Sequence, residues 1–289
     1  QRRAWAVSEV DKRQEYKRES RRATGAYPAG PATSAADAGL YEPVELESIA
    51  QGRSTDYIGG LLRTGAIQSH QVSLSGGSDK TTFFISGNFF KDKGVVINQD
   101  FSRYTFRINL DHQINKKVKI GTSTLVAYSE RNGENFNPLG GALQENPLGK
   151  PFDDEGNLIF LPTADGLRTN PFAEIVPGAQ QDLTKRYRIF TSLFANWEIA
   201  KGLTYRFVFG PDFNIERNGR FTGSETNSRR GGDATGSVSE EFRFNYTVEN
   251  ILTYNKTFKT NHNLNLTALQ SIQRDNLEIT RLIVQGIPA

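Results

Sequence analysis

Apolar and polar residues alternate strictly between Arg103 and Asp111. Because successive side chains of a β-strand point to opposite faces, this alternation predicts a strand with one apolar and one polar face. The predicted apolar face carries Tyr104, Phe106, Ile108 and Leu110, and the polar face carries Arg103, Thr105, Arg107, Asn109 and Asp111. A strand of this kind suits a half-buried soluble sheet or a barrel wall between lipid and water.

The same pattern recurs about eight times along the chain, and the connections between the strands differ in length. Two connections, near 76–79 and 200–202, are short and rich in Gly, whereas those at about 131–184, 216–236 and beyond 275 are long. Alternating short and long connections are typical of an antiparallel transmembrane β-barrel, whose long loops lie on the extracellular side. The predicted strands are 67–76, 80–92, 100–112, 117–130, 185–199, 202–215, 237–255 and 261–275.

Strand length and aromatic placement favour a membrane barrel over a soluble sheet. Several predicted strands exceed ten residues, whereas soluble strands most often have about 5–6. Tyr187 and Trp197 bound one apolar face, and Phe244 and Tyr254 have the same separation. Ten residues at roughly 3.3 Å each, tilted by about 40°, span about 25 Å, the height of a lipid-facing band. We therefore expect these four aromatic side chains at the membrane interfaces.

Asn250 interrupts the apolar face of the seventh predicted strand. Either a β-bulge changes the register at this residue, or the side chain meets another part of the protein.

The amino-acid composition excludes several classes of protein. The hydrophobic fraction is 36% and the mean hydropathy is −0.53, and no run approaches the roughly 18 apolar residues of a membrane-spanning helix. Cysteine is absent, which excludes disulfides, thiol catalysis and Cys-ligated zinc. The net charge of +3 is spread along the chain without a recognition module, so we expect no nucleic-acid partner. The chain contains no Met, and we expect it to be part of a longer translation product.

We find no pattern typical of an enzyme, a metal site or a cofactor site. His70, His112 and His262 stand far apart, and no Gly-x-Ser-x-Gly motif occurs. The acidic stretch at 152–157 lacks the ligand spacing of a calcium loop, so a solvated turn is the better interpretation. The charged residues of the polar faces are instead candidates to line a barrel lumen, where they would form salt bridges or contact substrate; they include Arg103, Arg107, Asp111 and Arg188.

The first 66 residues differ from the rest of the chain. Residues 1–25 are dense in charge, and Trp5, Val7 and Val10 form a partial helical stripe that predicts a short surface helix. Residues 27–36 indicate an irregular loop, and 41–65 another short helix or coil.

Three blocks of sequence carry a resemblance to a known family. They are RTGAIQSHQVSLSGGSDKT at 63–81, FFKDKGVV at 89–96 and FSRYTFRINLD at 101–111. Their succession and spacing resemble the barrel of the SusC/RagA family of TonB-linked outer-membrane transporters of Bacteroidetes. This resemblance implies a 22-stranded barrel that is closed by a plug, and of which this chain is an internal piece. Residues 1–66 would then be an extracellular loop region with possible short helices, and 67–289 would be part of the barrel, with a long loop at about 131–184. It also implies import of oligosaccharides or peptides, driven through TonB by parts of the protein outside this chain, with a SusD-like surface lipoprotein as partner.

Two rival hypotheses remain at this point. One is a small structural or adhesive outer-membrane barrel of eight strands that does not transport. The other is a soluble β-sandwich that binds carbohydrate.

Overall fold

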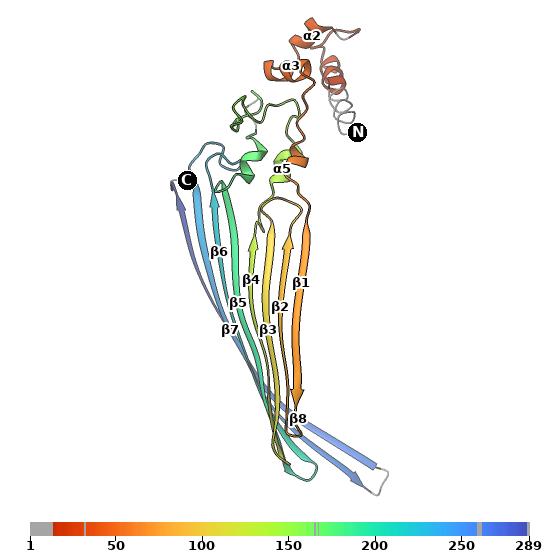
Figure 1. The fold of residues 1–289 in the computed structure, drawn as a ribbon, viewed down its shortest axis with the longest axis vertical. Helices are drawn as coiled ribbons and strands as arrows, with labels where there is room; N and C mark the ends of the chain where they lie inside the picture. Colours follow the sequence, from red (N-terminus) through yellow and green to blue (C-terminus); the bar gives the residue numbers. More distant parts are fainter. Residues whose placement is uncertain (1–13, 32, 165, 167, 259–261, 288–289) are drawn as a thin grey trace.

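Eight antiparallel strands form one open sheet in the order in which they occur in the chain (Figure 1). The computed structural model describes residues 14–31, 33–164, 166, 168–258 and 262–287. Each strand pairs with the next, and β1 and β8 are the two edges. The strands are β1 Ala66–Gly77, β2 Thr81–Lys93, β3 Asp100–Asn115, β4 Val118–Asn132, β5 Gln180–Ala200, β6 Leu203–Thr222, β7 Thr235–Phe258 and β8 His262–Gln285.

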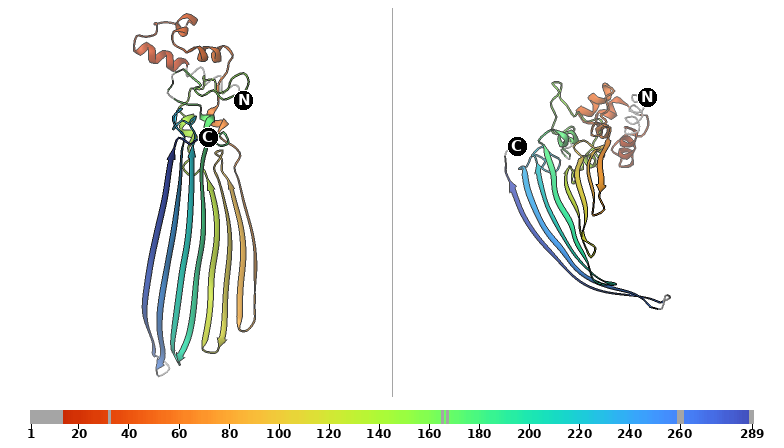
Figure 2. Two further views of the ribbon diagram at one scale, coloured as in Figure 1. Left: turned by 90° about the vertical axis from the view of Figure 1, so that its left-hand side faces the viewer. Right: turned by 60° about the horizontal axis from the view of Figure 1, so that its bottom comes forward.

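The sheet is a single curved layer, and its strands lengthen from one edge to the other. Figure 2 shows the strands side by side and bowed along their length. The shortest strand, β1, has 12 residues, and β7 and β8 have 24 each. Within the described residues the sheet neither closes on itself nor packs against a second sheet. The eight predicted strands are confirmed, and neither the closed eight-stranded barrel nor the two-layer sandwich is the fold found.

Short turns at one end of the sheet fix the strand register. The Asn115 side chain accepts hydrogen bonds from the backbone N–H groups of Lys117 and Val118, at 2.8 and 3.0 Å. Gly202 lies between β5 and β6 with a φ of +80°, which a residue without a side chain adopts at little cost. The two register shifts, at Gln113/Asn115 and Glu198/Ala200, both lie beside these turns. Turn chemistry therefore sets the pairing of the long strands.

Three predicted boundaries are wrong. β5 begins at Gln180, β6 continues to Thr222 and β8 continues to Gln285, where loops had been predicted. In β8 the alternation changes phase after Ile272, because the next large apolar side chains, Leu277 and Ile279, lie on the opposite face. The pairing of β8 with β7 nevertheless continues without a bulge. Backbone hydrogen bonding thus extends these strands beyond the point at which the side-chain pattern ends.

A lobe of loops and short helices covers one end of the sheet. This loop lobe consists of residues 14–65 and the connection 133–179, and it lies above the strands in Figure 1. Residues 14–23 are helical, as predicted for this region, whereas Trp5, Val7 and Val10 lie outside the described residues. The region 27–36, predicted as an irregular loop, ends in a helix that starts at Ser34. The other helices are α2 Ser34–Ala38, α3 Pro43–Ala50, α4 Tyr57–Gly60, α5 Pro138–Ala142 and the 3₁₀ helix η1 Pro171–Ile175.

The hydrophobic core lies in this lobe and not in the sheet. Tyr57, Leu61 and Ala142 are buried, and Leu139 and Phe172 pack against them. None of the described helices has the length and apolar character that crossing a bilayer requires. Among the described residues, every fully buried hydrophobic side chain lies outside the eight strands. The apolar side chains of the sheet are thus left without a protein layer to cover them.

Candidate functional site

One face of the sheet is apolar from β1 to β7 and over the first half of β8. The register aligns Tyr104 of β3 with Tyr128 of β4 and Tyr187 of β5 on this face. Tyr104 and Tyr187 are half exposed, at 51% and 50%. The predicted lipid-facing residues all lie on this apolar face: Tyr104, Phe106, Ile108, Leu110, Tyr187, Trp197, Phe244 and Tyr254. The structure therefore brings them together, and their contact with lipid stays a prediction.

A row of aromatic side chains crosses the apolar face near the loop lobe. Ring centroids are 5.0 Å apart between Phe89 and Tyr104, 6.2 Å between Tyr104 and Tyr128, and 4.8 Å between Tyr128 and Tyr187. His70 of β1 extends this aromatic row, with its ring 6.3 Å from that of Phe89. Phe89 and His70 were not predicted from the sequence as members of this row. The length of the turn between β1 and β2 sets the register that aligns them.

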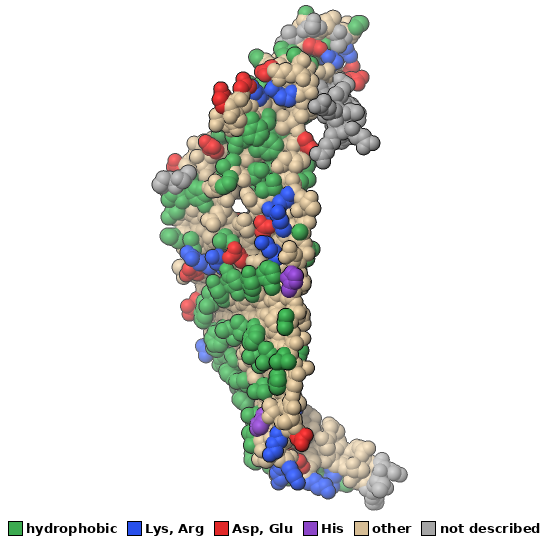
Figure 3. All heavy atoms as spheres, viewed as in Figure 1, with side chains coloured by type: hydrophobic (Ala, Val, Ile, Leu, Met, Phe, Trp, Pro, Cys, Tyr) green, Lys and Arg blue, Asp and Glu red, His purple; other side chains and the backbone are tan. Residues whose placement is uncertain are grey.

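Charged side chains replace the aromatic row two residues closer to the loop lobe. The apolar face carries four charged neighbours at this level, Glu130, Lys185, Arg217 and Glu240, and Ser102 separates Glu130 from a fifth charge, Lys91. Lys185 is 3.9 Å from Glu130, and Arg217 is 3.3 Å from Glu240. Figure 3 shows blue and red side chains above a band of green hydrophobic side chains on this face. So sharp a change from apolar to charged is typical of a membrane boundary.

A second group of aromatic residues marks the opposite limit of the apolar face. Trp197 of β5 lies beside Tyr205 of β6, and Tyr254 of β7 lies beside Leu203. Ten residues separate Tyr187 from Trp197, which corresponds to roughly 33 Å along the strand. The apolar face therefore has aromatic side chains at both limits, as the sequence predicted.

Asn250 meets other side chains and does not mark a bulge. The pairing of β7 with β6 and β8 runs through this residue without a register shift. Its carbonyl oxygen accepts a hydrogen bond from the Tyr205 hydroxyl at 2.5 Å, and its amide donates to the Gln270 side chain at 2.7 Å. Of the two explanations left open by the sequence, contact with another part of the protein is confirmed. Hydrogen bonds between side chains of three strands compensate for a polar residue on the apolar face.

The opposite, polar face carries the predicted lumen residues. Arg188 donates two hydrogen bonds to Asp212, at 2.9 and 2.7 Å, and Asp111 pairs with Lys119 at 2.8 Å. The Arg103 guanidinium lies over the Phe90 ring, 5.6 Å from its centroid. Arg107 forms no ion pair with another described residue. The structure thus places all four predicted residues, Arg103, Arg107, Asp111 and Arg188, on the polar face, and salt bridges or ring contacts hold three of them: Arg103, Asp111 and Arg188.

Contacts between arginine and phenylalanine recur on this face and were not predicted. Arg188 lies 5.6 Å from the centroid of Phe190, and Arg206 lies 4.6 Å from that of Phe194. The sequence signal was available, because each Phe interrupts a polar face near a position occupied by Arg. The polar face therefore combines cations, hydrogen-bonding groups and aromatic rings, which suits contact with polar solutes.

A buried carboxylate joins the two parts of the loop lobe. Glu45 of α3 is 2% exposed and accepts hydrogen bonds from Lys17 at 2.8 Å, from the Glu42 N–H at 2.8 Å and from Asn146 at 2.6 Å. Burial alone would raise the pKa of Glu45, but these hydrogen bonds together hold the pKa below its ordinary value. The Ser48 hydroxyl also donates to the Leu148 carbonyl at 2.7 Å. Segments about a hundred residues apart are thus held together by polar contacts.

The loop lobe also contains a carboxyl group with a raised pKa. Glu174 of η1 is 7% exposed, and burial raises its pKa, although the Asn227 N–H donates to it at 2.6 Å. The Gln180 amide donates to the same carboxylate. Glu174 therefore links the long connection 133–179 to the connection between β6 and β7.

No group of three His, Asp or Glu side chains in the described part of the chain is arranged to hold a metal ion. The acids of the stretch 152–157 bond within the loop: Asp153 accepts from Asn157, and Lys150 donates to Asp154 at 2.7 Å. This arrangement fits the solvated turn inferred from the sequence.

A long-stranded open sheet with an uncovered apolar face, a polar face and aromatic limits defines a wall segment of an outer-membrane type of β-barrel. No protein-family model matches the chain. The sequence is 30% identical over 247 residues to TonB-dependent receptor P3 of Formosa agariphila, covering 81% of this chain and 24% of that receptor. It is 25% identical over 240 residues to TonB-dependent receptor P26 of the same organism, with the same coverages of 81% and 24%.

Solved structures of the RagAB peptide importer have a similar fold. The open–open state superimposes with a TM-score of 0.67 at 20% identity, covering 82% of this chain and 27% of that one. The closed–closed state gives a TM-score of 0.65 at 21% identity, with coverages of 81% and 27%. The chain is thus SusC/RagA-like and related to TonB-dependent receptors, which confirms the resemblance. These relatives are receptors and importers and not enzymes, as the sequence analysis expected. The chain spans about a quarter of the length of the relatives it matches.

Proposed function

We propose that this chain forms part of the barrel wall of a TonB-dependent outer-membrane transporter. In this proposal the apolar face meets lipid, the polar face lines the lumen, and the loop lobe lies at the cell surface. The remaining strands, the plug and the segment that contacts TonB belong to the protein outside this chain.

The observation that carries the proposal is the uncovered apolar face. Large apolar side chains stay exposed along the strands, and among them Phe106, Ile189 and Leu193 are 44%, 46% and 42% exposed. In water so extensive an apolar surface would drive aggregation, whereas hydrocarbon solvates it. The aromatic row and the charged row beyond it support the same orientation, with the loop lobe on the far side of the membrane interface.

The proposed cargo is a nutrient such as an oligosaccharide or a peptide, and a SusD-like surface lipoprotein is the proposed partner. The polar face supports a path for polar solutes, because arginine, carboxylate and aromatic groups alternate along it. The similarity to RagAB, described as a peptide importer, supports the same class of function. In this proposal the loop lobe is the surface that faces the lipoprotein.

Site-directed spin labelling tests the membrane orientation directly. This sequence contains no cysteine, so an introduced cysteine is unique within it once any cysteine elsewhere in the full-length protein has been replaced by serine. Spin labels are placed one at a time along 103–111 of β3 in the full-length protein in liposomes. Their accessibility should alternate from one position to the next. Even positions should collide with dissolved oxygen, which concentrates in lipid, and odd positions with a water-soluble nickel complex. Uniform accessibility to the nickel complex would contradict the proposal.

Transport needs a separate measurement. Uptake of labelled oligosaccharides and peptides by cells that carry the full-length protein should depend on TonB. Deletion of the gene for the neighbouring SusD-like lipoprotein should reduce uptake. Uptake that persists without TonB would contradict the transporter assignment while leaving the membrane orientation intact.

A further inference from the structure

Two hollows on the apolar face share one wall. Phe89 and Tyr104, neighbours in the aromatic row, line both hollows. The upper hollow lies between this row and the loop lobe and has a volume of about 390 Å³. The lower hollow lies on the far side of the row, within the apolar face, and has a volume of about 890 Å³. The boundary between apolar and charged residues therefore passes between them.

The upper hollow carries unpaired positive charge. Lys91 and Lys93 of β2 are exposed on this face and line the hollow. Its two acids are already engaged, because Asp100 pairs with Arg63 at 2.6 Å and Glu130 accepts the Tyr128 hydroxyl at 2.9 Å.

Glu130 also lies 3.9 Å from Lys185 of the neighbouring strand. Neither Lys91 nor Lys93 forms an ion pair with another described residue. Two ammonium groups thus remain free to meet an anion just beyond the aromatic row.

The lower hollow exists because a glycine stands where the apolar face otherwise carries a side chain. Gly87 of β2 pairs with Val72 of β1 and Phe106 of β3. A Cβ atom added at Gly87 would meet no atom within 4 Å. The hollow is therefore an apolar gap beside His70, Phe89 and Tyr104 that a hydrocarbon chain can fill.

We propose that these two hollows together bind one anionic lipid whose headgroup carries phosphate. Its phosphate lies against Lys91 and Lys93, and one acyl chain passes Phe89 and Tyr104 to lie over Gly87. Lysine suits this position, because its apolar stem lies along the sheet while the ammonium group reaches the headgroup level. This inference rests on the proposed function, since it requires that the apolar face meets lipid.

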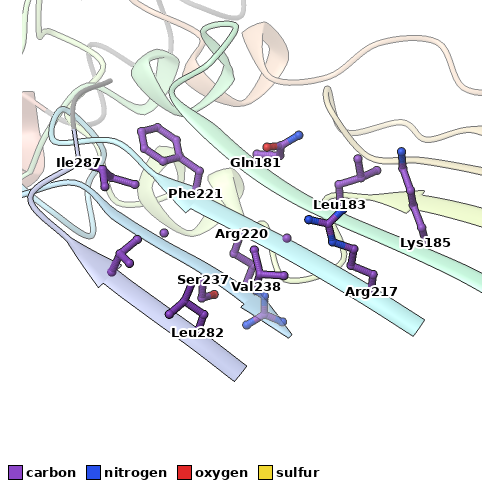
Figure 4. Close-up of a pocket in the computed structure, with 13 residues that line it drawn as sticks. Gln181, Leu183, Lys185, Arg217, Arg220, Phe221, Ser237, Val238, Leu282 and Ile287 are labelled. Carbon is purple, nitrogen blue, oxygen red and sulfur yellow. The ribbon is translucent and has the colours of Figure 1, made fainter. Parts of the chain in front are cut away.

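A third hollow on the same face also contains cations, but acids already pair with them. It lies near the loop lobe between β5, β6, β7 and β8, with a volume of about 400 Å³, and Figure 4 shows its lining residues. Its two cations on the apolar face, Lys185 and Arg217, face Glu130 and Glu240. The cations of this hollow are already matched by acids. We therefore assign the anionic lipid to the hollow with Lys91 and Lys93.

Native mass spectrometry of the full-length protein in detergent tests the headgroup site. Delipidated protein is titrated with palmitoyl-oleoyl phosphatidylglycerol, which is anionic, and with the matching phosphatidylcholine, which is zwitterionic. We expect the wild type to bind the anionic lipid more tightly. The double variant Lys91→Gln/Lys93→Gln should reduce this preference by about tenfold. A double variant that keeps the full preference would overturn the proposal.

The matched control is Lys116→Gln/Lys117→Gln, which removes the same charge from the turn between β3 and β4 at the opposite end of the sheet. It should keep the preference for the anionic lipid. Equal losses in both double variants would show a general effect of net charge and would overturn the specific site.

Gly87→Leu tests the acyl-chain site without removing charge. Because a Cβ atom at Gly87 meets no atom within 4 Å, we expect the leucine side chain to extend into the hollow. We expect weaker binding of both lipids at this site, an unchanged preference between them and an unchanged Tm. Gly219→Leu is the control, since a Cβ atom there also meets nothing within 4 Å. Unchanged lipid affinity in Gly87→Leu would overturn the acyl-chain placement.

The spin-label measurement separates failure of this inference from failure of the proposed function. Suppose that label accessibility alternates on β3 but that substitutions at Lys91, Lys93 and Gly87 do not change lipid binding. This result would overturn the lipid site and leave the proposed membrane orientation unaffected. Labels that do not alternate would overturn both.

Discussion

The guanidinium of Arg188 on β5 forms a two-point contact with the carboxylate of Asp212 on β6, with Nε–Oδ1 at 2.9 Å and Nη2–Oδ2 at 2.7 Å. The two side chains are 48% and 17% exposed, and they belong to strands that pair along almost their whole length. Paired hydrogen bonds of this kind fix orientation as well as charge. The contact therefore holds Arg188 against the wall of the polar face.

We predict a coupling free energy of about 1 kcal/mol between Arg188 and Asp212, because the pair is bidentate but half exposed to water. A double-mutant cycle with Arg188→Gln and Asp212→Asn, followed by unfolding in detergent or lipid, measures it. The exposed pair Arg217–Glu240, with a shortest distance of 3.3 Å, serves as control and should give less than about 0.5 kcal/mol. Equal coupling in the two pairs would show that the two-point geometry adds nothing.

A charged side chain on the apolar face of β3 should lower the stability of the folded protein in a bilayer. We predict that Ile108→Lys destabilises the protein by about 2–4 kcal/mol in a bilayer, because its ammonium group would lie near the middle of the lipid-facing band. Thr105→Lys places the same charge on the polar face of the same strand and should cost less than about 1 kcal/mol. Reversible unfolding of the two full-length variants from phospholipid vesicles makes the comparison. Similar costs for both would contradict the assignment of the faces.

The strands could be predicted from the sequence because their signal is local. In β3, the apolar residues from Tyr104 to Leu110 keep one phase of the two-residue repeat, and the pattern alone separates Tyr104 from Arg103. In the second half of β8 the phase changes, and only the pairing with β7 maintains the strand. A prediction from side-chain alternation must stop there, since the hydrogen bonds that extend the strand come from another part of the chain.

The packing of the loop lobe could not be predicted for a related reason. Its short helices bury their apolar residues against segments far away in the sequence, as in the contact of Ser48 with Leu148. Such pairings leave no periodic trace in either segment. On the polar face the sequence predicted Arg188 but not its partner Asp212, because the residues that pair across strands depend on a register shift beside the β5–β6 turn.

Asn250 gives a prediction about polar groups on the apolar face. We expect Asn250→Leu to destabilise the protein by about 1–2 kcal/mol although it restores the apolar pattern, because the Tyr205 hydroxyl and the Gln270 amide lose their partner. The double variant Asn250→Leu/Gln270→Leu should recover most of this loss, since it removes both amides together. The free energies of unfolding of the two variants in lipid, compared with that of the wild type, test this prediction. A stabilising effect of Asn250→Leu alone would contradict the role given to these hydrogen bonds.

The stability of the loop lobe should depend on pH through Glu45. Its pKa lies below the ordinary value of 4.5, so its ion pair with Lys17 stabilises the lobe above about pH 4.5 and is lost as the pH falls through the folded-state pKa. We predict that Glu45→Gln lowers the protection of α3 against hydrogen exchange at pH 7 by about 2 kcal/mol, because buried partners lose the charge they bind, and that it removes the pH dependence. Glu47→Gln, at an exposed position of α3, should change neither. Protection that stays constant from pH 7 down to pH 3 in the wild type would contradict this role of Glu45.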